Sequence, residues 1–143
     1  MPGCATMRAL SSIARPMIRS DLLRRICLVL TALVFALIAG RAAIAPDRLA
    51  HGLGYTLAAP NGYSEIFAVY VGVWLATAWL AIAAARRVKD AWLGDLVALF
   101  VLSQPAARAV AALSWGLPTG TLLFMFAVEA VGGALLLLVR PTA

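Results

Sequence analysis

Charged residues, histidine and cysteine are scarce in this sequence, and each shortage argues against a class of protein. Only 13% of the residues are charged, against about 25% in an ordinary soluble domain. The two cysteines, Cys4 and Cys27, are too few and too far apart for a disulfide framework or a CxxC redox centre. The only histidine, His51, has no second histidine or cysteine near it, so the sequence offers neither a metal site nor haem ligands for a membrane oxidoreductase.

Basic residues outnumber acidic ones, with twelve Lys and Arg against six Asp and Glu. A net charge of +6 suggests nucleic acid as one possible partner. The cations stand beside apolar segments, however, and no basic stripe interleaved with aromatic residues joins them. Arginines in such places are typical of membrane orientation signals and of contacts with anionic lipid. We therefore expect no nucleic-acid partner.

What the sequence has in excess is apolar length: 64% of the residues are hydrophobic and the mean hydropathy is +0.95. This excess falls in four blocks of about the length that crosses a bilayer. We predict an all-α integral membrane four-helix bundle of up-down-up-down topology. A basic tail is expected over 1–25 and a membrane domain over 26–140, with spans at about 26–45, 66–85, 91–113 and 121–139. The segment 46–65, rich in Gly and Pro, is predicted to be the longest loop.

The first span has an alternative interpretation as a secretory signal peptide, because a basic segment precedes a short apolar one and small residues follow. Against this, the basic segment is long and Arg41 interrupts the approach to a cleavage site. As a span, the same segment needs Arg41 to lie within one or two turns of the far membrane surface, either reaching outward or paired.

The distribution of cations predicts the orientation. Nine of the twelve basic residues fall in the tail, in the "RRVKD" hinge between spans two and three, and at Arg140. With four spans these segments share one side, which should be cytoplasmic, so that both termini face inward. The opposite loops hold only Arg48 as an unambiguous surface cation.

Two charges of opposite sign lie within the predicted spans and should meet. Arg108 is five residues before the outer end of span three and Glu129 is eight residues after the start of span four. At helical rise these depths are roughly 8 and 12 Å. The short "SWGLPTG" turn makes the two helices antiparallel neighbours. Because a charge at membrane depth normally has a partner, we predict a buried Arg108–Glu129 pair.

The surroundings of the pair suggest a larger polar cluster. Gln104 lies one turn from Arg108, and Pro105 leaves the carbonyl of Val101 without its helical donor. Small residues at helical spacing are expected to face inward, among them Gly132 and Gly133 in span four and Ala68, Gly72 and Ala76 in span two.

Arg41 and Glu65 are also expected at the outer end, which would make two similar hairpins, each with a late cation and an early carboxylate. The predicted buried polar cluster is therefore Arg108, Glu129, Gln104, Glu65 and Arg41. Asp95, one turn from the inner surface, is expected within reach of Arg86, Arg87 or the tail. We interpret Asp95 as an acid at the membrane interface near a helix N-terminus. The alternative interpretation is a role in a proton relay.

The second half of the chain resembles a bacterial family of small four-span membrane proteins, domain-of-unknown-function family 4345. The likeness rests on "SEIFAVYVGVW", an arginine in span three, "WGLPTG" and the glutamate of "LLFMFAVEAVGGALLLL", and it covers roughly 26–139. Span two of the family typically begins with an acid, an arginine, and a tyrosine followed by two glycines. Glu65 and Tyr70 match that pattern, whereas Phe67 replaces the arginine and Val71 the first glycine. The resemblance carries the family arginine to Arg108 and the glutamate to Glu129, and it implies no known activity.

No catalytic motif is present, so we expect no enzymatic activity and no cofactor. The leading expectation is a small multi-pass protein of the bacterial inner membrane whose polar cluster is structural or binds a partner or lipid. The alternative is a small proton-coupled transporter or channel subunit that uses Glu129. Expected partners are the lipid bilayer and either a second copy of the chain or a membrane partner protein.

Overall fold

The computed structural model describes residues 20–141, and this part of the chain is helical with no strand. Its elements are α2 (Asp21–Ile44), α3 (Pro46–Gly52), α4 (Ala59–Ile66), the π-helix η2 (Phe67–Val73), α5 (Trp74–Arg86), α6 (Ala91–Trp115) and α7 (Gly120–Leu138). Four stretches are long and apolar enough to cross a membrane: Asp21–Ile44, Ala59–Arg86, Ala91–Trp115 and Gly120–Leu138. The prediction of an all-α protein with four spans is confirmed.

The first helix begins at Asp21, five residues before the predicted start of its span. Ser20 caps it, because the Ser20 hydroxyl accepts a hydrogen bond from the Leu23 backbone N–H at 3.2 Å. Asp21 adds a negative charge to the first turn, where the helix dipole favours it. The predicted tail therefore includes the first turn of α2, and its residues 1–19 lie outside the described part.

The prediction of a long loop over 46–65 was wrong for most of that segment. Pro46 and Pro60 lie in the first turns of α3 and α4, where a missing backbone N–H costs no hydrogen bond. The helix that begins at Ala59 then continues through η2 into α5 and ends at Arg86. At this end of the molecule the Tyr63 hydroxyl donates a 2.7 Å hydrogen bond to Asp47, which ties α4 to α3.

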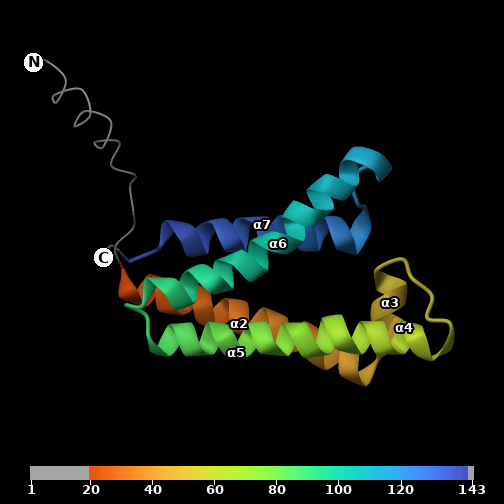
Figure 1. Ribbon diagram of the computed structural model, residues 1–143, viewed down its shortest axis with the longest axis horizontal. Coiled ribbons are helices and arrows are strands. Elements are labelled where there is room, and N and C mark those ends of the chain that lie inside the picture. The colour runs from red at the N-terminus through yellow and green to blue at the C-terminus, as the bar shows by residue number, and fades with distance from the viewer. Residues whose placement is uncertain (1–19, 142–143) are drawn as a thin grey trace, which may run out of the picture.

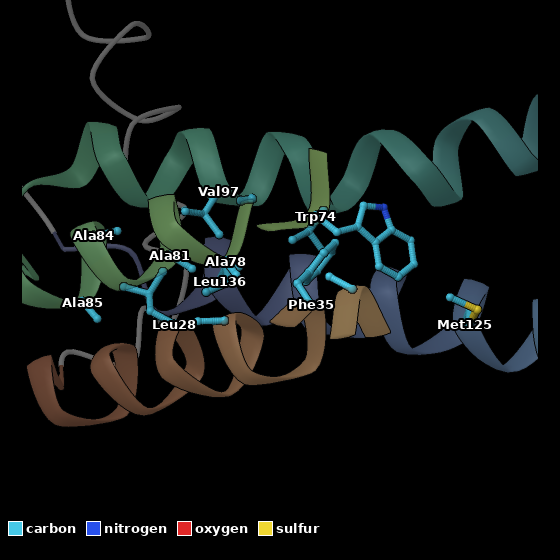
Figure 2. Close-up of a cluster of buried hydrophobic side chains, with 14 of the residues drawn as sticks. Leu28, Phe35, Trp74, Ala78, Ala81, Ala84, Ala85, Val97, Met125 and Leu136 are labelled. Carbon is cyan, nitrogen blue, oxygen red and sulfur yellow. The ribbon is translucent and has the colours of Figure 1, made fainter. Parts of the chain in front are cut away.

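The core lies where α2 packs against α5, with α6 and α7 closing it. Leu28, Phe35 and Trp74 are among its large side chains, and several alanines of α5 lie beside them (Figure 2). Phe35 meets the Trp74 ring edge-on, with the ring centroids 5.2 Å apart. Small residues at a helix crossing let the backbones approach, as in other membrane bundles.

The expectation for the small residues of span two was wrong, because Ala68, Gly72 and Ala76 are exposed. The buried face of that helix contains Trp74 instead. The other buried residues on this face are Thr77, Ala78, Ala81, Ala84 and Ala85. Of the two α7 glycines, Gly133 is buried, and a Cβ added there would overlap the Leu102 side chain rather than a backbone. Gly132 has open space around it.

Large apolar side chains cover the outside of the bundle on every long helix. Leu37 in α2 and Phe124 in α7 are each 69% exposed, and Trp79 and Leu99 are similarly open. A surface of this kind is incompatible with water over most of its area and is suited to lipid. Trp92 and Trp115, exposed near the two ends of α6, stand where aromatic belts meet the membrane surfaces. The chain is a multi-pass membrane protein.

The first turn of α2 and the last turn of α7 lie at the same end of the molecule (Figure 1). The α3–α4 segment and the turn between α6 and α7 lie at the other end, where the C-terminal half of α6 diverges from α5 (Figure 1).

Candidate functional site

Arg108 of α6 and Glu129 of α7 form an ion pair in which an Nη1 hydrogen of Arg108 is donated to Oε2 of Glu129. The Arg108 side chain is 19% exposed and that of Glu129 only 8%. Two opposite charges so far from water stabilise each other more than a surface pair does, because the surrounding dielectric is low. The pair joins α6 to α7.

The hairpin of α6 and α7 explains why these two residues meet. The connecting turn contains Gly116 with a φ of 82°, a conformation that glycine adopts without strain, and α7 begins at Gly120 with a φ of 57°. At the opposite end of the hairpin, Arg140 binds both carboxylate oxygens of Asp95, at 3.0 and 2.8 Å. Asp95 thus pairs with Arg140, two residues after the end of α7, and not with Arg86 or Arg87, whereas residues 1–19 of the predicted tail lie outside the described part.

The other members of the predicted cluster do not join the pair. Gln104 is half-buried one turn away, and no hydrogen bond links it to Arg108 or Glu129 in the described part of the chain. Arg41 and Glu65 are both exposed, and no ion pair joins them. The first of the two similar hairpins that we expected therefore lacks its ion pair within residues 20–141. The short α3 helix follows α2 at Pro46, and α4 carries Glu65 on a turn that faces outward.

Glu129 also lines a cavity of about 200 Å³ between α2, α6 and α7. Its wall is mostly apolar. The residues that line it include Cys27, Thr31, Phe35, Val101, Glu129 and Gly132. Cys27 is half-buried in this wall. The carboxylate is the only acidic group in this wall.

A second buried cation, Arg24, was missed by the sequence interpretation, which placed it in the tail. It is 3% exposed, and its Nη2 donates hydrogen bonds of 3.3 Å to the backbone carbonyls of Asp90 and Ala91. Its Nε has no partner in the described part of the chain. The guanidinium lies against Gly94 of α6, where any Cβ would overlap it. Arg24 thus fastens the start of α2 to the start of α6.

One signal in the sequence points to the burial of Arg24. Arg24, Leu28 and Ala32 recur at intervals of four, so they share the face of α2 that packs into the core. Once Ser20 and Asp21 are taken as a helix start, Arg24 lies on that face rather than in a tail.

Comparison with known families matches residues 23–140 to the family described as Domain of unknown function (DUF4345). The chain belongs to this family. No curated protein and no solved structure matches the chain. The resemblance found in the sequence is therefore confirmed, and the description of the DUF4345 family assigns no activity to it.

In span two, Tyr70 matches the expected DUF4345 pattern and Phe67 departs from it. The two side chains lie in different surroundings. Tyr70 is half-buried and packs on Trp74 with the ring centroids 4.8 Å apart. Phe67, in place of the family arginine, is exposed on the outer surface. The tyrosine thus packs against the core, whereas position 67 lies on the outside of the bundle.

Proposed function

We propose that this DUF4345 protein resides in the bacterial inner membrane with up-down-up-down topology and both termini in the cytoplasm. The proposal is supported by the distribution of cations over the helix ends. Arg86, Arg87 and Lys89 stand between α5 and α6, at the same end as Arg140 and the start of α2. Arg48 lies in α3, beyond the far end of α2. Cytoplasmic loops carry the excess of Lys and Arg in such proteins.

Cysteine labelling tests this orientation. In a background with Cys4→Ser and Cys27→Ala, we expect an Arg48→Cys variant to react with a membrane-impermeant maleimide in intact spheroplasts. A Lys89→Cys variant should react only after permeabilisation. Both positions are exposed, so accessibility depends on the side of the membrane. The reverse labelling pattern would contradict the orientation.

We further propose that the Arg108–Glu129 pair is a structural link that holds the α6–α7 hairpin in register. The observation that carries this proposal is the burial of both side chains against each other at similar depth. A charge within a bilayer costs about 3 kcal/mol on insertion scales, so either charge is tolerated only with its partner. The apolar packing around the pair adds no second partner for the carboxylate.

A proton-coupled role for Glu129 is the second candidate, favoured by the contact of Glu129 with the cavity. Glu129→Gln separates the two. If the pair is structural, the variant should fold but with a lower thermal midpoint than the parent, because the amide oxygen still accepts from Arg108 while the guanidinium loses its counter-charge. Asp95→Asn on the same hairpin is the matched control. A variant that folds normally but loses a proton flux measured in proteoliposomes would instead establish the transport role.

A further inference from the structure

The cavity beside Glu129 opens toward the lipid side of the bundle. Its rim includes Leu30 of α2, 55% exposed, and Leu135 of α7, 44% exposed. Val34 and Val128 on the same rim are also exposed. A molecule dissolved in the bilayer therefore reaches the carboxylate laterally, between α2 and α7, without crossing water.

The two oxygen-bearing side chains of the cavity wall, Thr31 and Glu129, offer acceptors. Thr31 has already donated its hydroxyl hydrogen to the Cys27 carbonyl at 2.9 Å, which leaves the hydroxyl oxygen as an acceptor. Glu129 accepts from Arg108 through Oε2, and among the described residues no donor bonds to Oε1. An ionised carboxylate has acceptor sites for several hydrogen bonds. A ligand that completes this wall must supply a hydrogen-bond donor.

Charge and size narrow the ligand further. Arg108 already neutralises Glu129, so a cationic ligand would bring an uncompensated charge into a low dielectric. A neutral donor avoids that cost. The volume of about 200 Å³ exceeds the roughly 150 Å³ of an apolar cavity that holds benzene. One aromatic ring of a ligand therefore fits in the cavity. An apolar tail attached to that ring can extend into the bilayer between the exposed rim residues.

We propose that this cavity binds the ring of a neutral, lipid-soluble molecule of the phenol or quinol class, with its hydroxyl donating to Glu129 and its tail extending into the bilayer. This site goes beyond the structural role of the ion pair: binding can fail while the pair still holds the hairpin. Phe35 lines the same cavity and offers an aromatic surface to the ring.

Gly132 gives a way to close the cavity without disturbing the fold. Nothing lies within 4 Å of a Cβ added there, and Gly132 itself lines the cavity. A leucine at this position grows into the site. Gly40 of α2 is the matched control, because it also has nothing within 4 Å of an added Cβ and does not line the cavity.

The test uses the full chain in nanodiscs and a 4-hexylphenol probe that carries a diazirine on its tail. We expect saturable photolabelling of peptides from α2 and α7. Unlabelled 4-hexylphenol should compete about tenfold more strongly than 4-hexylanisole, which has the same ring and tail but no donor. Gly132→Leu should lose the saturable labelling and Gly40→Leu should keep it, with unchanged thermal midpoints for both.

Three results would overturn the proposal. Equal competition by the phenol and the anisole would mean that the cavity takes any apolar chain. Labelling that survives Gly132→Leu would place the site elsewhere. Stronger competition by protonated 4-hexylbenzylamine than by the phenol would mean that the site selects a cation. The stability of the Glu129 variants reports separately on the structural role of the pair.

Discussion

Replacing Glu129 by leucine should lower the free energy of unfolding by about 3 to 5 kcal/mol. The loss arises because Arg108 keeps its charge: a guanidinium does not deprotonate in proteins, and the Arg108 side chain is mostly buried. Without the carboxylate, the charge either remains uncompensated among apolar side chains or pulls away and disturbs the end of α6. Reversible unfolding in mixed micelles measures this loss.

Asp95→Leu supplies the control on the same two helices. The Asp95–Arg140 pair is more exposed than the Arg108–Glu129 pair, with side chains 26% and 51% exposed. Exposed pairs contribute about 0 to 1 kcal/mol, since water solvates either partner when the other is removed. Equal losses for Glu129→Leu and Asp95→Leu would contradict the account of the buried pair.

Replacing Gly94 by alanine should destabilise the protein by about 2 kcal/mol, although alanine is normally the better helix former. The added Cβ overlaps the Arg24 guanidinium, which must move away. Arg24 then loses its hydrogen bonds to the carbonyls of Asp90 and Ala91. Hydrogen bonds from a charged group are among the stronger ones in proteins. Thermal unfolding of the purified variant measures the effect.

Two comparisons isolate the cause. Gly40→Ala places a Cβ in open space within α2 and should leave stability unchanged or slightly raised. In a chain that already carries Arg24→Ala, the additional Gly94→Ala change should cost nothing more, because no guanidinium remains to displace. Additive losses for Arg24→Ala and Gly94→Ala would contradict the account in which Gly94 makes room for the Arg24 guanidinium.

The contact between Arg108 and Glu129 follows from counting along the sequence. A short uncharged turn forces α6 and α7 to be antiparallel, and helical rise then gives each side chain its depth. Depth counting works for the two members of one hairpin. It failed for Arg41 and Glu65, because the α3 helix follows α2 and the next span begins at Ala59, well before Glu65.

Other features depend on tertiary packing that periodicity does not reveal. Arg24 stands next to Arg25 in the sequence, yet one is buried and the other exposed, because only one lies on the face that meets α6. Span two offered a face of small residues and a face with Trp74, both suitable for a helix crossing. The face with Trp74 is buried because it packs against Phe35 of α2.

The structural role of the pair is tested most directly by a double-mutant cycle of Arg108→Leu and Glu129→Leu, with unfolding measured for the parent, both single variants and the double variant. The account predicts that each single variant is strongly destabilised and that the double variant recovers most of the loss, because two apolar side chains replace the buried charges. The coupling energy should then be about 2 kcal/mol or more. A double variant as unstable as the sum of the two single variants would contradict the account.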